Sequence, residues 1–183
     1  MPNGFNLQAF YAAAQANEFA RDFQFHIKVL GPLNESDNLY MTTASLPGLG
    51  IHDQTVTYYG HNFHVPGTID YQGNGNWSVT FHCDEGQNIR EKLIAWQKEI
   101  FSFETSGGKY GVPVETATIE LVGKNPAEAT RTFELVGIYP VTVGDVNYNV
   151  TGSGAVLDIQ VTFAYQYWRE TGGSSALLPS VLG

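Results

Sequence analysis

Alternation between apolar and polar residues is the main pattern along this chain, and it is clearest over residues 77–83. There Trp77, Val79, Phe81 and Cys83 are apolar, and one polar residue separates each from the next. Strict alternation is typical of a β-strand with one buried face, because successive side chains point to opposite faces. Related patterns predict strands over about 23–29, 38–45, 115–123 and 130–137, two short strands within 53–65 around Tyr59-Gly60, and a short strand near 144–150.

The longest alternation covers residues 155–168. Apolar residues take every second position from Ala155 to Tyr167. A single strand of about 14 residues would span roughly 45 Å at ~3.3 Å per residue, and it would exceed the usual ~3–10 residues. We therefore expect this strand to belong to a sheet larger than one protomer can build.

One helix is predicted over about 85–101. Asp84 supplies a capping carboxylate and Gln87 follows three residues later, which is a variant of the capping box. An apolar stripe at helical spacing is expected to pack against the sheets; it consists of Ile89, Leu93, Trp96 and Ile100. A weaker helical spacing over 7–17 predicts a short helix or arm.

Glycine and proline mark the boundaries between these elements. Pro66-Gly67 is expected to close the strands within 53–65, residues 73–76 form a turn, and 103–114 form a flexible loop. We find no linker between domains. The predicted organisation is an N-terminal arm or short helix over 1–20, one β domain over 21–169 and a tail over 170–183.

The amino-acid composition restricts the classes of function that this chain can have. Charged residues make up only 15% of the 183 residues, against about 25% in a typical soluble domain, whereas 10 Tyr, 11 Phe and 3 Trp are present. The net charge of −9 opposes binding to nucleic acid, which requires Lys and Arg against phosphates. Without a long apolar run or a signal peptide, and with a single cysteine, we expect a soluble intracellular protein.

Candidate chemistry is sparse. His61 and His64, three residues apart in a strand, would point to opposite faces, and Cys83 shares the face of Trp77, Val79 and Phe81, so a buried core thiol is favoured over a nucleophile. Residues 106–110 fail the phosphate-loop pattern, because Phe103 and Tyr110 stand where Gly and Ser or Thr are needed. We therefore expect no catalytic residues, no metal and no cofactor, and the residues alone favour assembly over catalysis.

Several stretches together resemble the tail tube proteins of contractile-tailed bacteriophages. In the order of that family they are Ala44-Ser45-Leu46-Pro47-Gly48, Tyr59-Gly60, Pro66-Gly67, Trp77-Ser78-Val79-Thr80-Phe81 with Asp84-Glu85, Ala95-Trp96-Gln97, Phe133-Glu134-Leu135-Val136-Gly137-Ile138-Tyr139-Pro140, Val143-Gly144 and Ala164-Tyr165-Gln166-Tyr167-Trp168. The match covers about 18–169. It departs from the family in the 103–116 loop, the N-terminal arm and the 170–183 tail.

This resemblance implies a mainly β fold: a two-sheet β sandwich or barrel with one packed helix. It implies hexameric rings that stack into a tube, with the inner sheets joined into one shared β-barrel. The implied partners are other copies of the chain, a contractile sheath protein, a baseplate, a tape measure protein and DNA, which passes through the lumen without specific binding. The implied location is the virion tail, assembled in the bacterial host cytoplasm. Sixfold repetition of the net charge of −9 would repel the DNA.

Two sets of residues are candidates for these roles. Polar residues on the long strands are expected to face the lumen: Glu120, Glu134, Asp158, Gln160 and Thr162. Apolar residues that a lone domain would struggle to cover are expected to join successive rings: Leu49, Ile51, Val56, Tyr58, Tyr59 and Phe63. The terminal arms are a second candidate for the contact between rings.

Two alternatives stay open at this point. The same type of fold also serves as the tube protein of a type VI secretion system or of a phage-tail-like bacteriocin, and the sequence alone does not separate these cases. From a different class, an acidic β-barrel with many aromatic residues could be a carrier that holds a small ligand between its sheets.

Overall fold

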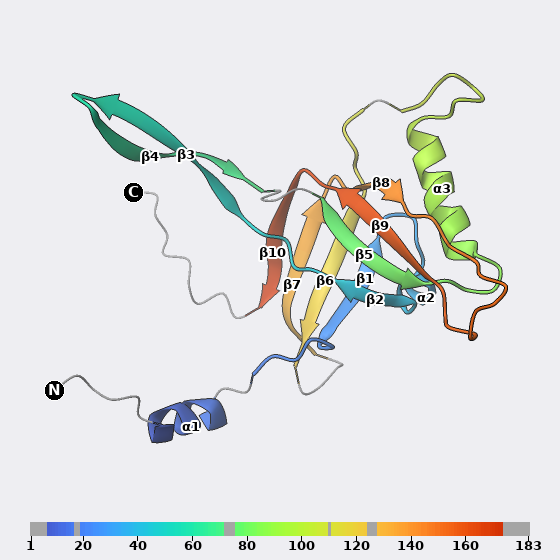
Figure 1. Cartoon of the computed structure of the whole chain (residues 1–183), viewed down its shortest axis with the longest axis horizontal. Helices are drawn as coiled ribbons and strands as arrows, with labels where there is room; N and C mark the ends of the chain where they lie inside the picture. Colours follow the sequence, from blue (N-terminus) through green and yellow to red (C-terminus); the bar gives the residue numbers. More distant parts are fainter. Residues whose placement is uncertain (1–6, 17–18, 72–75, 110, 124–127, 174–183) are drawn as a thin grey trace.

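The computed structural model describes residues 7–16, 19–71, 76–109, 111–123 and 128–173 (Figure 1). Within these ranges strands dominate, as the alternating patterns predict. In chain order the elements are α1 (Leu7–Ala16), β1 (Phe25–Leu30), α2 (Glu35–Asn38), β2 (Met41–Ala44), β3 (Gly50–Tyr58), β4 (His61–Asp70), β5 (Trp77–His82), α3 (Asn88–Ile100), β6 (Thr116–Val122), β7 (Ala129–Val136), β8 (Tyr139–Val143), β9 (Asp158–Ala164) and β10 (Tyr167–Gly173). The turn predicted at 73–76 falls almost wholly outside the described residues.

Two four-stranded sheets form a sandwich, which confirms the predicted mainly β, two-sheet fold. The first sheet has the order β1-β6-β7-β10 and the second has the order β2-β5-β9-β8. All neighbouring strands in both sheets are antiparallel. The remaining pair, β3-β4, is a separate two-stranded sheet that projects from the sandwich (Figure 1).

The core lies between the two sheets and under α3. The burial of β5 alternates strictly, with Trp77, Val79 and Phe81 inside, as its sequence predicts. The ring of Phe163 from β9 is fully buried, and its centroid lies 5.6 Å from that of Trp77 and 5.9 Å from that of Trp96. Aromatic packing therefore joins β5, β9 and α3 into one core.

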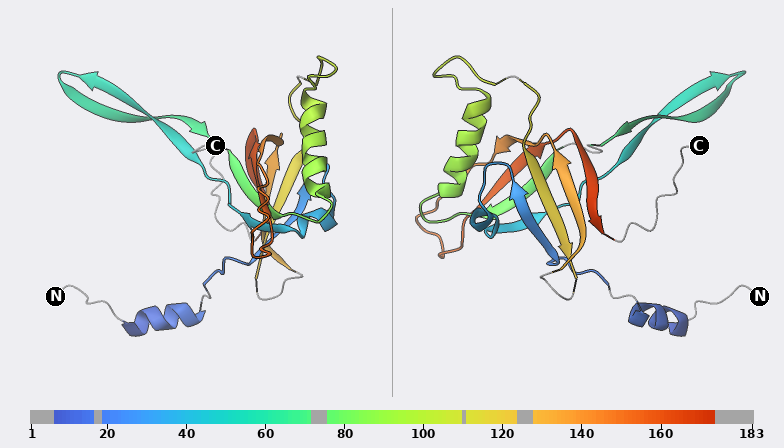
Figure 2. Two further views of the ribbon diagram at one scale, coloured as in Figure 1. Left: turned by 45° about the vertical axis from the view of Figure 1, so that its right-hand side comes forward. Right: turned by 180° about the vertical axis from the view of Figure 1, so that it is seen from behind.

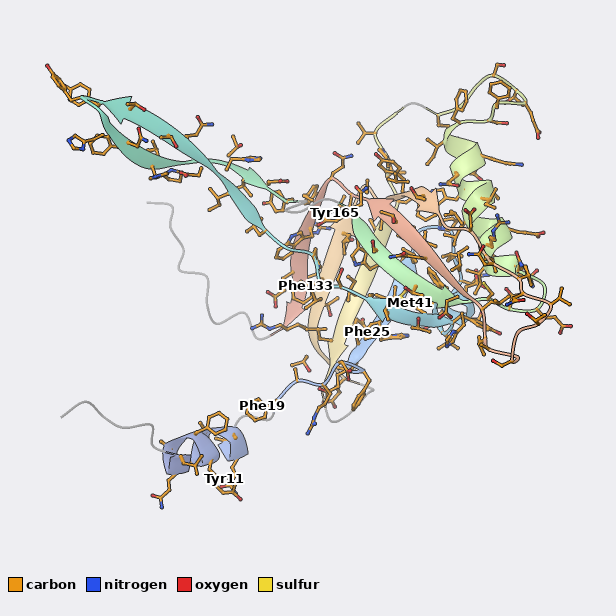
Figure 3. All side chains as sticks on the ribbon, in the orientation of Figure 1. Tyr11, Phe19, Phe25, Met41, Phe133 and Tyr165 are labelled. Atoms are coloured by element: carbon orange, nitrogen blue, oxygen red, sulfur yellow. The ribbon has the colours of Figure 1, made fainter. Side chains whose placement is uncertain are left out.

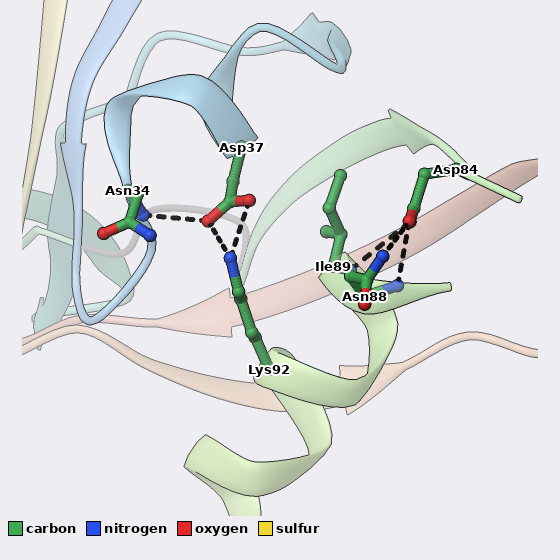
Figure 4. A network of polar contacts seen from close by, with 6 residues as sticks. All are labelled: Asn34, Asp37, Asp84, Asn88, Ile89 and Lys92. Atoms are coloured by element: carbon green, nitrogen blue, oxygen red, sulfur yellow. Dashed lines mark hydrogen bonds and ion pairs between the residues drawn. The ribbon is translucent and has the colours of Figure 1, made fainter. Parts of the chain in front are cut away.

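Helix α3 begins at Asn88, three residues later than predicted. Gln87 has a left-handed backbone (φ 52°), so it cannot belong to the helix. Instead, the carboxylate of Asp84 reaches across and accepts hydrogen bonds from the backbone N–H groups of Asn88 (3.1 Å) and Ile89 (3.5 Å) (Figure 4). Burial alone would raise the pKa of Asp84, but these bonds and the bond from the Asn88 side chain favour the charged form and together lower it.

The predicted apolar stripe of α3 is confirmed at three positions out of four. Ile89, Leu93 and Trp96 are buried in the core. Ile100, at the last position of the helix, is only half-buried and lies outside the core. The helix has reached the margin of the sandwich by this point, so its final turn has less apolar surface to cover.

The single long strand predicted over 155–168 is wrong. The chain forms two strands, β9 and β10, and these belong to different sheets. Ala164 and Tyr165 are both buried, which breaks the alternation, and the N–H of Gln166 donates to the carbonyl of Val136 (2.9 Å) where the chain crosses between sheets. Apolar residues on both sides of a sheet-to-sheet crossing look like one uninterrupted strand in the sequence.

The short strand predicted near 144–150 is also misplaced. The strand is β8, Tyr139–Val143, and no residue from 144 to 157 is in a strand. β8 pairs with β9 through an irregular register between Pro140 and Thr142. Pro140 within an edge strand weakens the pattern by which strands are recognised.

A β-bulge changes the inward face of β1. The register with β6 shifts between Ile27 and Val29, so Leu30 is fully buried whereas Val29 is exposed. The sequence alternation places Val29 inside, and Phe23, which comes before the strand begins, is exposed as well. A bulge of this kind changes the face of the sheet toward which the following side chains point.

An ion pair fastens α2 to α3 (Figure 4). The Nζ of Lys92 lies 2.8 and 2.7 Å from the two carboxylate oxygens of Asp37, which is only 8% exposed and also accepts a bond from the backbone N–H of Asn34 (2.9 Å). If Lys92 were removed, the carboxylate of Asp37 would be a buried charge without a cation to pair with.

Lys92→Met is therefore expected to lower the free energy of unfolding by about 1.5–3 kcal/mol. Lys98→Met, on the exposed side of the same helix, is the matched control. Denaturant titration of both variants compares the two values. Equal effects for the two variants would show that the ion pair contributes nothing.

Candidate functional site

The β3-β4 hairpin is the most unusual part of the surface. It extends away from the sandwich in all three views (Figures 1 and 2), and every residue from 51 to 69 is exposed. A two-stranded hairpin is marginal on its own in water. This one therefore has the properties of an element that is completed by another chain.

A tight turn closes the hairpin at its tip. Tyr59 (φ 48°) and Gly60 (φ 78°) both have positive φ, as a type I′ turn requires. The rings of Tyr58 and Tyr59 meet edge to face, with centroids 4.8 Å apart. The tip therefore presents two aromatic rings, and Tyr59 is 87% exposed.

The two faces of the hairpin differ in chemistry. The strand register pairs Val56 with Phe63 and Gln54 with Val65 on one side, and it pairs Thr55 with His64 on the other. We call Val56, Tyr58, Phe63 and Val65 the apolar face of the hairpin. On the opposite face, polar side chains contact one another. His64 Nδ1 lies 2.6 Å from Asp53 Oδ2, and the hydroxyl of Thr57 donates to Asn62 Oδ1 (2.9 Å).

All six residues predicted to join rings are exposed. Val56, Tyr58 and Phe63 share the apolar face, Tyr59 stands at the tip, Ile51 pairs with Ile69 near the base, and Leu49 comes just before β3. Their contacts in an assembly stay a prediction.

Sequence reasoning missed Ile69, because Pro66-Gly67 indicates the end of a strand, and it left Val65 out of the contact candidates although Val65 lies within the predicted strands. β4 instead continues to Asp70. Pro66 is tolerated in a ribbon whose strands are both edges, beside a register shift in β3 between Ile51 and Asp53. The hairpin is therefore longer than the two short strands predicted within 53–65.

The residues predicted to face the lumen fall into two groups. Glu120 and Glu134 lie on the outward face of the β1-β6-β7-β10 sheet, opposite buried Ile119 and Leu135. Each has a basic neighbour there: Lys28 Nζ lies 3.4 Å from Glu120, and Arg169 Nε lies 2.6 Å from Glu134. The bond to Glu134 raises the pKa of Arg169, because it favours the charged guanidinium.

Asp158, Gln160 and Thr162 lie on the outward face of the other sheet, because the residues between them, Ile159 and Val161, are buried. Asp158 Oδ1 is 2.6 Å from His82 Nδ1. The outward faces of a sandwich look in opposite directions. The five residues therefore do not share a surface, and one channel wall can hold only one of the two groups.

Other chemistry is limited in the part of the chain that the structure describes. No group of three or more His, Cys, Asp and Glu residues gathers there in a way that could hold a metal ion. Cys83 packs against the core, and burial, with a smaller effect of Asp158, raises the pKa of its thiol. His61 and His64 lie on opposite faces of the hairpin, as their spacing predicts. Across the described residues, the helices are too short or too polar to cross a bilayer.

A small sandwich that holds an amphipathic hairpin away from its core is a protein built for assembly. The family model described as phage tail tube protein matches residues 2–171. The chain therefore belongs to the phage tail tube protein family, and it is a structural protein of the virion tail.

Relatives in other phages are similar over most of their length. The tail tube protein gp19 of Enterobacteria phage T4 is 23% identical over 159 residues, which cover 86% of this chain and 95% of that protein. Tail tube protein gp19 of Enterobacteria phage T6 is 22% identical over the same shares of each chain.

Solved structures of similar fold come from contractile injection systems. The sheath/tube terminator of the extracellular contractile injection system PVC superposes with a TM-score of 0.64 at 15% identity, over 85% of this chain and 99% of that chain. A chain of the PVC sheath-tube complex has a TM-score of 0.60 at 14% identity, over 87% and 96%. A chain of the anti-feeding prophage baseplate has a TM-score of 0.63 at 12% identity, over 86% and 99%.

Proposed function

We propose that this chain assembles as hexameric rings that stack into the tube of a contractile phage tail. The observation that carries this proposal is the exposed hairpin with its apolar face, in a chain that belongs to the tail tube family. The sheath surrounds the tube, the baseplate starts it, and assembly takes place in the host cytoplasm. Sheath-tube and baseplate proteins of similar fold support these partners.

The hairpin is the proposed joint between successive rings. Its apolar face offers Val56, Phe63 and Val65 to a neighbouring chain, and burying them there removes apolar surface from water. The polar face stays solvated, since Asp53 and His64 already satisfy one another. The hairpin, which is only marginally stable on its own, then gains stability from this contact.

The sheet β1-β6-β7-β10 is the proposed wall of the channel. A sheet that continues from copy to copy needs free edges. The edge at β8 of the other sheet is closed, because Pro140 has no N–H and Gln97 Nε2 donates to the carbonyls of Pro140 (3.4 Å) and Val141 (3.1 Å). In the described part of the chain, no strand lies beyond β10 or beyond β1. Part of the β1 edge is already occupied, because the carbonyls of Lys28 and Leu30 accept bonds from Asn38 Nδ2 (3.4 Å) and from the N–H of Leu33 (3.0 Å).

This assignment changes the proposed role of the acidic residues. Glu120 and Glu134 would form rings of carboxylates in the lumen, each neutralised in part by Lys28 or Arg169. The resulting wall does not attract a polyanion strongly, so tape measure protein and DNA can slide along it. Asp158 would then lie outside the channel.

Replacing both glutamates tests the lumen proposal. Glu120→Gln with Glu134→Gln leaves Lys28 and Arg169 without carboxylates, so the wall becomes cationic and holds DNA by its phosphates. We expect tubes of normal length and a fall in infectivity of at least about tenfold, with genome release recovering at high salt. Asp158→Asn, on the other sheet, is the control and is expected to leave infectivity unchanged.

The reverse result, with Asp158→Asn impaired and the double glutamine variant normal, would place the β2-β5-β9-β8 sheet on the channel instead.

A further inference from the structure

A pocket lies between the two sheets at the end of the sandwich opposite the hairpin tip. We call it the basal pocket, and its volume is about 490 Å³. Its apolar wall draws on both sheets and on the segment before β1: Phe19, Phe25, Leu46, Ile119 and Leu121. In Figure 3, Phe19 lies below the sheets and Phe25, the first residue of β1, lies at their lower end, whereas the hairpin points upward (Figures 2 and 3).

We propose that the basal pocket of one copy receives the tyrosine tip of the hairpin of a second copy, with Tyr59 as the anchor. This inference rests on the proposed function, in which the hairpin joins stacked rings. It adds the surface that receives the hairpin and the side chain that enters it. A tip and a pocket at opposite ends give a head-to-tail contact, which repeats without closing and builds an open stack.

Charge complementarity favours another copy of this chain as the occupant. Residues 50–70 contain two acids, Asp53 and Asp70, and no Lys or Arg. The basal pocket is lined by Arg21 and Arg131 with one acid, Asp22. Asp53 and Asp70 lie along the strands and not at the tip, beside His64 and His52, and Arg131 also lies 3.8 Å from Glu170. The complementarity is therefore between this end of the sandwich and the hairpin as a whole, which brings no Lys or Arg toward the arginines.

The backbone at the tip supports a role for the Tyr59 side chain. Asn and Gly are the residues favoured at the first central position of a type I′ turn, and Tyr is not. Tyr59 nevertheless adopts φ 48° and is 87% exposed. Residues held in unfavourable conformations cluster at contact and switch sites, and tyrosine is one of the three residue types that most often dominate binding energy.

The pocket and the tip also agree in size and chemistry. A volume of about 490 Å³ is within the ~300–1,000 Å³ range of pockets that enclose small molecules, so it accommodates the aromatic rings of a hairpin tip. Apolar Leu46 and Leu121 would contact the ring, and Thr130 and Arg131 at the same pocket offer polar partners for the phenol hydroxyl.

Substituting Tyr59 separates the contribution of the turn backbone to stacking from that of the side chain. Tyr59→Asn keeps the turn, because Asn-Gly is the sequence that type I′ turns favour, but it removes the anchor. Electron microscopy and sedimentation should show that the concentration needed for tube formation rises about 30-fold. If the hairpin acts only through its backbone, the variant will form tubes as well as or better than the wild type, and this result would overturn the inference.

Blocking the pocket tests the other half of the contact. Leu46→Glu, just after β2, and Thr130→Glu, on β7, place an acid beside the arginines of the pocket, where it opposes an acidic hairpin and the entry of an aromatic ring; both positions are exposed, so both variants should fold. Each is expected to prevent stacking while single rings persist. Leu39→Glu, at an exposed leucine outside the pocket, is the matched control and should form tubes like the wild type.

Mixing the variants gives the sharpest result. Tyr59→Asn rings keep the pocket and Leu46→Glu rings keep the tip, so rings assembled separately and then mixed should form stacks of two and stop. Long tubes from either variant at the wild-type concentration would overturn the inference. Absence of tubes from the wild-type chain itself would instead overturn the proposed function.

Discussion

Removing the hairpin is expected to abolish tube formation and to leave the domain folded. Gly50 and Asp70 pair directly across the base of the hairpin, so replacing residues 51–69 by Asn-Gly removes both strands and joins these two residues with a two-residue turn. No residue of this segment belongs to the core. The shorter loop costs less entropy to close, so the unfolding midpoint should stay the same or rise slightly.

The apolar face should carry most of this effect. Phe63→Ser removes an aromatic ring from it, whereas Asn62→Ser, at the adjacent position, changes the polar face. Sedimentation velocity on the purified variants should show rings without stacks for Phe63→Ser and tubes for Asn62→Ser. Normal tubes from the deletion variant would show that successive rings are joined elsewhere, with the terminal arms as the next candidate.

Leu93→Ala is expected to destabilise the domain strongly. The side chain is fully buried between the helix and the sandwich, and removal of such a leucine costs about 2–5 kcal/mol through lost burial and the cavity left behind. Chemical denaturation measures the change in the free energy of unfolding.

Two controls on the same helix sharpen this test. Ile100→Ala should cost clearly less, because Ile100 is half-buried and lies outside the core, and Lys98→Ala, at an exposed position, should have almost no effect. A loss for Leu93→Ala no larger than that for Lys98→Ala would show that α3 does not pack as described.

The elements that the sequence predicts best are those whose burial follows a single period. β5 alternates in sequence and in burial, and α3 places Ile89, Leu93 and Trp96 on one stripe that is also buried. In these segments the local pattern and the tertiary environment agree, so the residues alone are sufficient.

The errors occur where the chain changes its environment within one pattern. Tyr165 continues the alternation of β9 while the backbone crosses to the other sheet, and the bulge after Ile27 moves Leu30 inward without any glycine or proline to mark it. Pro66 stands inside β4, where an unpaired ribbon edge makes its missing N–H harmless.

Only part of the candidate site could be predicted from the sequence. Exposed apolar residues such as Val56 and Phe63 indicate a contact surface, because a lone domain cannot cover them. The lumen residues are different: Glu134 and Asp158 both alternate with buried neighbours, and only the sheet order shows that they face opposite ways. The ion-pair partner of Glu134 is Arg169, which is distant in sequence and becomes its neighbour only because β10 pairs with β7.

Electron microscopy of tubes formed by the purified full-length chain tests the central claim most directly. The account predicts stacked rings of six copies, with the hairpin of each copy inserted into the adjacent ring and with Glu120 and Glu134 on the channel wall. A chain that stays monomeric at every concentration, or rings that stack with their hairpins pointing freely into solvent, would contradict it.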